Sequence, residues 1–443
     1  MQKTVYALFF LFLVATSCTM QARIGKSANK ILLNAPEIKK AHIGISIYDP
    51  SSKKYLFTNN SESNFIPAST TKLFTLFAGM KYLGDSLTGA FYRKNNDTLF
   101  LVPNADPSFM SKKFSVHPLL EMIKKNESSI CFVIPSDSIE PYGPGWAWDD
   151  QQEPYMAQRT VMPIYENQLK LIYGKKNNND SSYSLVQMNT EVPGFSQTIT
   201  YDSSRNFIQR KPGTNNIITT LNRKENEMEF NIPFETFGNK AAIQTLENLS
   251  YRKPSIRADS DILYGNYLPL YSQASDSAFS IMMHQSDNFF AEQLLLMIAQ
   301  SHLGKLHEKA LIDTLLQNDF QDIPQKPRWV DGSGLSRYNL FSPNDEIYIL
   351  DKLIREFGTD RLEQIFPTGG EGTMKNLFNK EAGFIFAKTG SFSNTFCISG
   401  WMYNADKKPI LFSVMVNQYI GKNKVLREAV ESFLKTIRTV SFK

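Results

Sequence analysis

Ser69 and Lys72 are the pair of residues whose types and spacing first suggest covalent chemistry. On a helix, positions i and i+3 share one face, so the hydroxyl and the amine can meet without help from distant parts of the chain. A serine hydroxyl is a poor nucleophile until a base takes its proton, and a neutral lysine amine can be that base. The pair therefore indicates a serine nucleophile with a lysine base.

The segment after Lys72 has the pattern of the helix that this geometry needs. Its apolar residues recur at helical spacing, and Gly84 is a suitable stop. A buried stripe of this kind would fix the helix and so aim the serine. The stripe consists of Leu73, Leu76, Phe77, Met80 and Leu83.

Ser-x-x-Lys is too common to decide the matter alone. The same spacing occurs at Ser27–Lys30, Ser51–Lys54 and Ser432–Lys435, where a solvated helix end is the simplest interpretation. Two further motifs support Ser69. Ser286-Asp-Asn288 is expected in a loop between two helices, and Lys388-Thr389-Gly390 is expected at the end of a strand over residues 384–389, just before a hairpin. A rigid strand there can lay a substrate alongside itself, with Lys388 and Thr389 facing the substrate's carboxylate.

The three motifs together resemble those of penicillin-binding proteins and class A β-lactamases. Further segments make the likeness more specific: the chain resembles the D-Ala-D-Ala carboxypeptidase/endopeptidase family, the class C low-molecular-mass penicillin-binding proteins, over roughly residues 40–435. These segments are Gly145-Trp-Ala-Trp-Asp-Asp150, Asp331-Gly-Ser-Gly-Leu-Ser-Arg337 with Ser342-Pro343, and Gly369-Gly-Glu-Gly-Thr373.

The resemblance implies a serine-type acyl transfer on peptidoglycan peptides. Ser69 would attack the carbonyl between two D-alanines, and Lys72 would act as base, kept neutral with the help of a second cation, Lys388. Ser286 would relay the proton to the leaving amine, and Asn288 would hold Lys72 and the substrate amide. The resemblance places the two oxyanion donors on the backbone N–H groups of Ser69 and Ser391.

Three more residues are candidates for substrate binding. Arg337 is expected to bind a carboxylate of the peptide, with a plain surface arginine as the alternative. Trp148 and Asp149 are expected to line a pocket for the diamino acid side chain, with structural packing of Trp146 and Trp148 as the alternative.

The expected fold class is α+β. The first and last thirds of the chain show helices and alternating strands of an antiparallel sheet, and residues 91–260 show short strands between loops rich in Asn, Ser, Pro and Gly. The resemblance implies a β-lactamase-like transpeptidase domain with a five-stranded antiparallel sheet. We expect this domain in two parts, residues 23–90 and 261–443, around a β-rich insertion at 91–260.

The N-terminus has the features of an export signal over residues 1–22. Lys3 precedes an apolar run from Val5 to Ala15, which is too short to span a bilayer. Small residues before Cys18 resemble a bacterial lipoprotein signal, so we expect a lipid on Cys18 and a periplasmic, membrane-anchored protein. The alternative is an ordinary signal peptide cut after Ala22, which would discard Cys18.

Composition excludes some other classes of function. The net charge of +5 is small for 443 residues, and no basic stripe with interleaved aromatics points to nucleic acid. Five dispersed histidines and the absence of a Cys-x-x-Cys motif argue against a dedicated metal site, and no cofactor is expected. Cys131 and Cys397 lie in apolar runs and are expected to be buried free thiols.

Two other functions remain open from the sequence. A β-lactamase would use the same site but would need rapid deacylation. A non-catalytic cell-wall-binding protein would carry the motifs as remnants. The expected partners are peptidoglycan peptides and β-lactams as covalent inhibitors.

Overall fold

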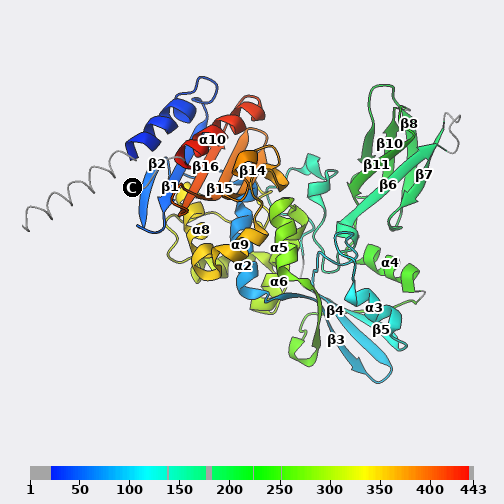
Figure 1. Ribbon diagram of the computed structural model, residues 1–443. Coiled ribbons are helices and arrows are strands. Elements are labelled where there is room, and N and C mark those ends of the chain that lie inside the picture. The colour runs from blue at the N-terminus through cyan, green and yellow to red at the C-terminus, as the bar shows by residue number, and fades with distance from the viewer. Residues whose placement is uncertain (1–20, 137–138, 176–181, 223, 251, 439–443) are drawn as a thin grey trace, which may run out of the picture. The chain divides into compact units, whose positions relative to one another are not determined.

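The computed structural model describes residues 21–136, 139–175, 182–222, 224–250 and 252–438 (Figure 1). It divides into two compact units. The first comprises residues 1–77, 279–286 and 315–443, and the second comprises residues 78–278 and 287–314. The predicted lipidation site, Cys18, lies outside the described residues.

The first unit is built on a five-stranded antiparallel sheet in the order β14-β15-β16-β1-β2. Each strand pairs with its neighbour in antiparallel register, which confirms the predicted sheet. The strands are β1 (His42–Asp49), β2 (Lys54–Asn59), β14 (Ile385–Phe392), β15 (Thr395–Tyr403) and β16 (Pro409–Asn417).

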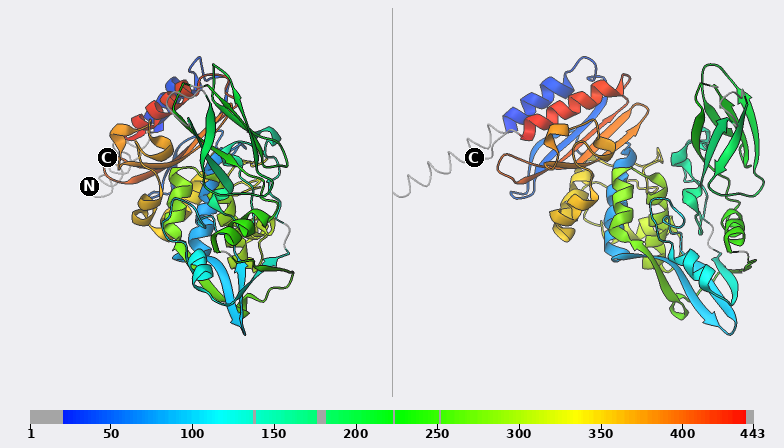
Figure 2. Two further views of the ribbon diagram at one scale, coloured as in Figure 1. Left: turned by 90° about the vertical axis from the view of Figure 1, so that its right-hand side faces the viewer. Right: turned by 45° about the vertical axis from the view of Figure 1, so that its right-hand side comes forward.

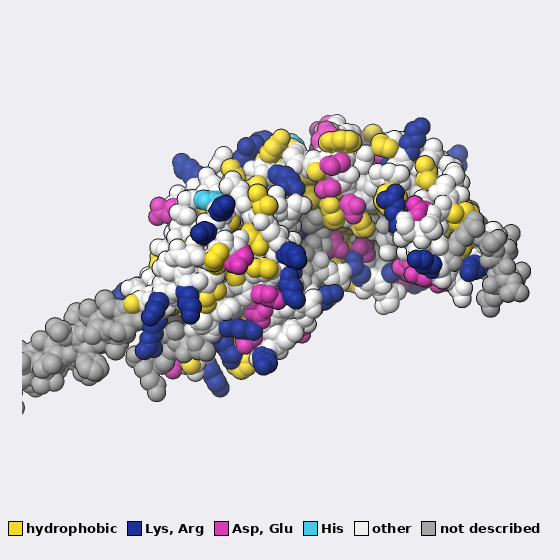
Figure 3. Space-filling view, turned by 90° about the horizontal axis from the view of Figure 1, so that it is seen from above, with side chains coloured by type: hydrophobic (Ala, Val, Ile, Leu, Met, Phe, Trp, Pro, Cys, Tyr) yellow, Lys and Arg dark blue, Asp and Glu magenta, His cyan; other side chains and the backbone are white. Residues whose placement is uncertain are grey.

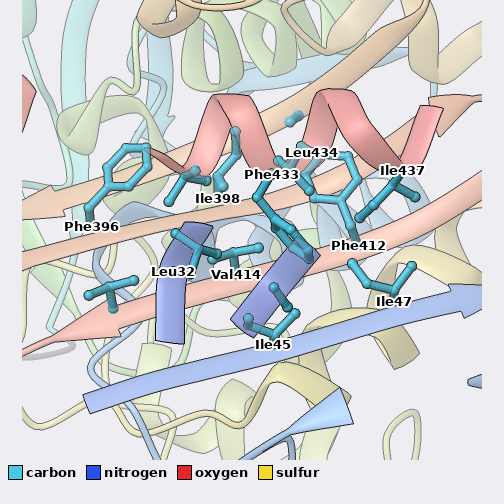
Figure 4. Close-up of a cluster of buried hydrophobic side chains, with 14 of the residues drawn as sticks. Leu32, Ile45, Ile47, Phe396, Ile398, Phe412, Val414, Phe433, Leu434 and Ile437 are labelled. Atoms are coloured by element: carbon cyan, nitrogen blue, oxygen red, sulfur yellow. The ribbon is translucent and has the colours of Figure 1, made fainter. Parts of the chain in front are cut away.

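One face of this sheet carries the main core of the first unit. Branched and aromatic side chains from alternate strand positions face helix α10 (Asn423–Arg438) and the helical residues 21–33, which end in the π-helical turn η1 (Asn29–Leu33) (Figure 4). The helix near the N-terminus and α10 lie side by side over the strands (Figure 2), and Ser27 hydrogen-bonds to Thr436 at 2.7 Å. Figure 4 labels Leu32, Ile45, Ile47, Phe396, Ile398, Phe412, Val414, Phe433, Leu434 and Ile437.

The opposite face of the sheet carries polar residues, among them the buried Ser46, Ser399 and Ser413. There the 3₁₀ turn η2 (Ala68–Thr71) packs on β14 and β15, and helix α8 (Pro343–Phe357) packs on β1, β15 and β16. Further elements of this unit are α9 (Thr359–Ile365), η7 (Gly372–Met374) and η8 (Asn379–Glu381). Because successive residues of a strand point to opposite faces, the same strands supply both the apolar core and this polar face.

Two helices run from one unit into the other. Helix α2 (Lys72–Tyr82) begins in the first unit, and helix α5 (Ser275–His284) ends there. The predicted stop at Gly84 is close, since α2 ends at Tyr82 and Gly84 has a φ of +67°.

The second unit is rich in strands, as predicted for the insertion. Its mixed five-stranded sheet has the order β12-β5-β4-β3-β13, and two three-stranded sheets follow, β8-β10-β9 and β11-β6-β7. Their bounds are β3 (Ser86–Asn95), β4 (Thr98–Pro103), β5 (Ser129–Pro135), β6 (Gln168–Lys175), β7 (Tyr183–Met188), β8 (Ser196–Tyr201), β9 (Phe207–Arg210), β10 (Asn216–Leu221), β11 (Glu227–Pro233), β12 (Ser255–Asp259) and β13 (Leu268–Ala274).

Helices complete the second unit, and its own apolar core lies between them and the strands. The helices are α3 (Pro118–Lys125), α4 (Lys240–Ser250), α6 (Asn288–Leu303) and α7 (Glu308–Gln317, whose last three residues fall in the first unit), with short 3₁₀ turns η3 (Trp148–Asp150), η4 (Pro154–Met156), η5 (Tyr165–Asn167) and η6 (Tyr264–Asn266). An α+β fold with a β-rich insertion is therefore confirmed.

Two local predictions need correction. Ser69 lies in a 3₁₀ turn rather than in the first α-helical turn; side chains at i and i+3 eclipse there, which keeps Ser69 and Lys72 aligned. Strand β14 does not end at residue 389, because its pairing with β15 continues to the Phe392–Thr395 pair. Gly390 and Ser391 are therefore strand residues.

Within the described residues, no helix combines the length and apolarity needed to cross a bilayer. On the face shown in Figure 3, Lys and Arg side chains are interspersed with Asp and Glu, in keeping with the small net charge. Cys131 and Cys397 are buried free thiols, as predicted.

Candidate active site

Ser69 and Lys72 meet as their spacing predicts. The Lys72 Nζ lies 3.0 Å from the Ser69 Oγ and donates a 2.6 Å hydrogen bond to the Ser333 carbonyl. Lys72 is fully buried, whereas Ser69 is only partly buried. The arrangement can therefore pass a proton from an accessible hydroxyl to an amine shielded from water.

A glycine-rich loop holds the Ser69 turn from one side. Gly334 has a φ of +80°, and a Cβ on it would fall 1.9 Å from the Ala68 carbonyl oxygen, so only glycine allows this approach. Thr75 on α2 hydrogen-bonds to the Gly332 carbonyl at 2.6 Å. Ala68 itself has a φ of +49°, a conformation that a non-glycine residue adopts only when its surroundings enforce it.

Asp331 gives this loop its shape. Its carboxylate accepts hydrogen bonds from the backbone N–H groups of Gly334 and Ser336 and from the Asn339 side chain, at 2.6–2.9 Å. These bonds curl the loop tightly. The Ser333 carbonyl, between the bonded residues, is thereby directed at Lys72.

Strand β14 lies against the other side of the turn. A Cβ on Gly390 would fall 2.5 Å from the Pro67 carbonyl oxygen and 2.8 Å from the Ser69 nitrogen. The glycine therefore lets the strand backbone come next to the nucleophile turn. Lys388, two residues earlier and fully buried, donates to the Ser286 hydroxyl at 2.8 Å and to the Thr389 carbonyl at 2.7 Å.

Ser286 is held in an unusual backbone conformation after α5. Its φ is +55°, which costs a non-glycine residue roughly 1 kcal/mol or more. The turn at 369–373 supports this loop, because a Cβ on Gly372 would fall 2.4 Å from the His284 carbonyl oxygen. From the same turn, Thr373 hydrogen-bonds to Thr389 at 2.7 Å, so one turn contacts both motifs.

The two site lysines influence each other's charge. Burial lowers the pKa of Lys388 well below its usual value, and the positive charge of Lys72 lowers it further. Like charges disfavour each other mutually, so the site resists holding two ammonium groups at once. An anion bound beside Lys388 would relieve this repulsion.

Two arginines from other parts of the first unit lie beside the end of β14. Ser391 is exposed, and its hydroxyl accepts a 3.1 Å hydrogen bond from Arg427 of α10. The Arg337 guanidinium lies 4.8 Å from the centre of the Phe392 ring and is exposed. Both guanidinium groups therefore lie within reach of whatever binds along the strand end.

Three of the predicted site residues, Asn288, Trp148 and Asp149, belong to the second unit. Asn288 is the first residue of α6, and its side chain donates to the Tyr155 carbonyl at 3.3 Å. Trp148 and Asp149 form the exposed turn η3, where Trp148 is 81% exposed. The alternative interpretation, in which Trp148 packs within the structure, is therefore wrong. The neighbouring Trp146 does pack, with Arg159 over its ring.

Sequence reasoning missed several groups that complete the site. The Ser333 carbonyl contacts Lys72, and a backbone acceptor has no signature in the residue type. Thr373 ends a glycine-rich turn that the sequence singled out, but its hydrogen bond with Thr389 could not be predicted. Arg427 lies on the closing amphipathic helix, where nothing in the helical pattern separates it from other polar positions.

The described residues contain no group of three or more His, Cys, Asp or Glu side chains that could hold a metal ion. What the geometry offers is a serine hydroxyl, two buried amines, a second serine and a strand edge. This set can carry out proton transfer and acyl transfer at one carbonyl.

Comparisons with known proteins agree with this geometry. The model of the D-Ala-D-Ala carboxypeptidase 3 (S13) family matches residues 25–437. D-alanyl-D-alanine carboxypeptidase DacB of Haemophilus influenzae is 22% identical over 452 residues, which cover 92% of this chain and 91% of the relative.

Solved structures show the same fold. The crystal structure of penicillin-binding protein 4 (dacB) from Haemophilus influenzae matches with a TM-score of 0.72 and 19% identity, covering 94% of this chain and 99% of that one. A predatory peptidoglycan endopeptidase from Bdellovibrio bacteriovorus matches with a TM-score of 0.50 and 14% identity, covering 90% and 92%. With the family match over nearly the whole chain, the protein belongs to the D-Ala-D-Ala carboxypeptidase 3 (S13) family and is a serine-type D-Ala-D-Ala carboxypeptidase.

Proposed function

We propose that Ser69 is the nucleophile with which this carboxypeptidase cleaves the bond between two D-alanines in peptidoglycan stem peptides and cross-links. The observation that carries this assignment is the 3.0 Å approach of the buried Lys72 amine to a partly exposed serine hydroxyl. The Ser69 Oγ bonds to the carbonyl carbon, the C–N bond breaks, and the terminal D-alanine leaves with its amine protonated. Water then hydrolyses the acyl-serine ester.

Lys72 acts as the base, and it must be neutral to do so. Its burial and the nearby second amine both favour the neutral form of one member of the lysine pair. When the substrate's terminal carboxylate binds beside Lys388 and Thr389, that carboxylate stabilises the charge on Lys388. The positive charge on Lys388 then disfavours a charge on Lys72. Lys72 is therefore neutral and can take the Ser69 proton.

Ser286 passes the proton onward to the leaving amine. Its hydroxyl hydrogen-bonds to the Lys388 ammonium at 2.8 Å, so its own proton is free to point elsewhere. In the same proposal, Asn288 holds the substrate amide. The backbone N–H groups of Ser69 and Ser391 stabilise the oxyanion, each contributing about 3 kcal/mol as in other hydrolases.

The remaining candidates select the peptide. Arg337 is exposed beside Phe392 at the end of β14, where a second carboxylate of the stem peptide would pass. Trp148 and Asp149 offer an aromatic face and a carboxylate for the diamino acid side chain, and the exposure of Trp148 supports a role in contact rather than in packing.

Export and anchoring complete the proposal. The apolar run of residues 5–15 and the small residues before Cys18 support a lipoprotein signal and a periplasmic protein held to a membrane by its lipid. Metabolic labelling with a radioactive fatty acid tests this, since Cys18→Ser should lose the label. Equal label in both proteins would contradict the lipid anchor.

The reaction is tested by incubating wild type and Ser69→Ala with a stem pentapeptide and with purified cross-linked peptidoglycan, and by measuring released D-alanine and split cross-links by mass spectrometry. We expect both products with wild type and neither with Ser69→Ala. Nitrocefin turnover in the same samples separates the β-lactamase alternative: fast turnover without D-alanine release would contradict the proposal.

A further inference from the structure

Behind the Ser69 turn lies a carboxyl group that the mechanism above does not use. Glu346 of α8 is fully buried, and its Oε1 lies 2.7 Å from the Oγ1 of Thr70, the residue next to Ser69. Its other oxygen, Oε2, has no hydrogen-bond partner among the described residues. A buried carboxylate in such a position would be expensive, whereas a protonated carboxyl would not.

The surroundings of Glu346 favour the protonated form. Helix α8 packs there on a row of serines, Ser46, Ser413 and Ser399, which are paired across the adjacent strands β1, β16 and β15. Ser399 and Ser413 bond to each other, and Ser46 donates to Asn344 of α8. This surface offers hydroxyl groups but no cation.

The titratable groups that face Glu346 do not balance a negative charge either. On its own helix the neighbour is Asp345, and on β15 it is the buried thiol Cys397. Lys72, on the helix that follows η2, directs its amine to Ser69 and Ser333 instead. Burial raises the pKa of Glu346 to about 8 and Asp345 adds to the rise, while the hydroxyl groups of Thr70 and, to a smaller extent, Ser399 oppose it.

The protonation state of Glu346 decides which acceptor the Thr70 hydroxyl can bond to. The Thr70 Oγ1 lies within hydrogen-bonding distance of two acceptors, Glu346 Oε1 at 2.7 Å and the Pro67 carbonyl at 3.0 Å, but a hydroxyl has only one proton to donate. If Glu346 is protonated, its O–H donates to Thr70, and Thr70 donates to Pro67. If Glu346 is ionised, Thr70 must donate to it, and the Pro67 carbonyl loses this bond.

Pro67 matters because it starts the nucleophile turn. From the part of the chain that the structure describes, its carbonyl otherwise receives only the longer, 3.4 Å bond from the Thr70 backbone N–H. The same carbonyl oxygen lies against Gly390 of β14, at 2.5 Å from where a Cβ would be. The hydrogen-bond chain therefore ends at the contact between the turn and the strand.

We propose that protonated Glu346 is a positioning residue, which holds the Ser69 turn in place through the chain from its carboxyl to the Thr70 hydroxyl to the Pro67 carbonyl. This inference rests on the proposed role of Ser69 as nucleophile. Loss of the Glu346 proton at high pH loosens the turn and slows acylation. An amide at position 346 can donate the same hydrogen bond at any pH, which gives a direct test.

The test measures the second-order rate of acylation by a labelled penicillin from pH 6 to pH 10. For wild type we expect a several-fold fall with a midpoint near 8, in addition to any effect of the site lysines. Glu346→Gln should keep the rate at pH 7 within about threefold and lose that midpoint. Glu356→Gln, the same change near the end of α8, should behave as wild type.

Two Thr70 variants test the link between the carboxyl and the turn. Thr70→Val removes the hydroxyl and should lower the acylation rate about tenfold at pH 7 and abolish the midpoint, whereas Thr70→Ser should restore both. Superimposable pH profiles for wild type and Glu346→Gln would overturn the inference, as would a Thr70→Val profile like that of wild type. Labelling of Ser69→Ala at the wild-type rate would instead overturn the proposed function, so the two failures are distinct.

Discussion

The Ser69 region and the Trp148 region were both selected from sequence motifs, yet they are built in opposite ways. Around Ser69 the functional groups are buried or closely supported: Lys72 and Lys388 are fully buried, and Gly334 and Gly390 bring backbones to contact. Around Trp148 the side chains are exposed on a 3₁₀ turn of three residues.

This difference in burial matches the different requirements of a reaction centre and of a surface that binds a peptide. A reaction at one carbonyl needs its groups fixed to within about half an ångström, and only a packed scaffold holds buried amines that precisely. A surface that selects a long peptide needs exposure instead. The first region should therefore respond strongly to single changes, and the second should respond weakly except with large substrates.

Removal of the Lys72 amine should have the largest effect. Lys72→Met keeps most of the side-chain length but removes the base, and we expect acylation by penicillin to fall about 10³-fold. Lys352→Met is the matched control, since the Lys352 amine belongs to the same unit but lies over the Phe77 ring, 5.2 Å from its centre. Stopped-flow labelling measures both. An acylation rate for Lys72→Met within tenfold of wild type would mean that Lys72 is not the base.

Crowding the contact between β14 and the nucleophile turn should come next. Gly390→Ala places a Cβ against the Pro67 and Ser69 backbones, and a shift of about 1 Å can cost roughly 10²-fold in rate. Gly265→Ala has open space around its Cβ and should have no effect on acylation. Equal rates for the two variants would mean that the close approach does not position Ser69.

The buried carboxyl behind the turn should also appear in the pH dependence of stability. Glu346 stays protonated in the folded protein up to about pH 8 but ionises near pH 4.5 when unfolded, so the free energy of unfolding falls as pH rises between these values. The slope is about 1.4 kcal/mol per pH unit for one such group. Burial raises the pKa of Asp345 to about 6, which adds to the slope at lower pH.

The difference between wild type and Glu346→Gln isolates Glu346 between pH 6.5 and pH 8. Burial lowers the pKa of Lys388, which adds an opposite slope to both proteins and cancels in the difference. By urea unfolding, wild type should lose about 2 kcal/mol of stability relative to Glu346→Gln between pH 6.5 and pH 8, and Glu356→Gln should follow wild type. Parallel stability profiles for wild type and Glu346→Gln would contradict a neutral Glu346.

Changes in the exposed region should be smallest. Trp148→Ala and Asp149→Asn should alter the free energy of unfolding by less than about 0.5 kcal/mol, as expected for surface sites. D-alanine release from a short dipeptide-ended substrate should stay within twofold, while KM for a stem peptide that carries the diamino acid should rise. A loss of stability above 2 kcal/mol in either variant would make the region structural.

Much of the fold could be predicted because it depends on local patterns. The alternating strands in the first and last thirds of the chain predicted the antiparallel sheet, and the apolar stripe after Lys72 predicted α2. The strand end at β14 was missed, because pairing with β15 extends it past the turn-like Gly390-Ser391. The domain boundaries at residues 90 and 260 remain a prediction.

The site was predictable where side-chain types carry the chemistry, and not where backbones do. Ser69, Lys72, Ser286 and Lys388 have reactive or charged groups at meaningful spacings. The Ser333 carbonyl, the +49° φ of Ala68 and the +55° φ of Ser286 depend on contacts with residues far away in the chain. Glu346 was missed because a glutamate in an amphipathic helix ordinarily faces water.

The covalent bond to the substrate is proposed to form at the hydroxyl of Ser69. Trapping the acyl-enzyme with penicillin, digesting it, and locating the added mass by tandem mass spectrometry identifies the residue that carries this bond. We expect one adduct, on Ser69, that Lys72→Met nearly abolishes. An adduct on any other residue, or the same adduct yield from Ser69→Ala, would contradict this proposal.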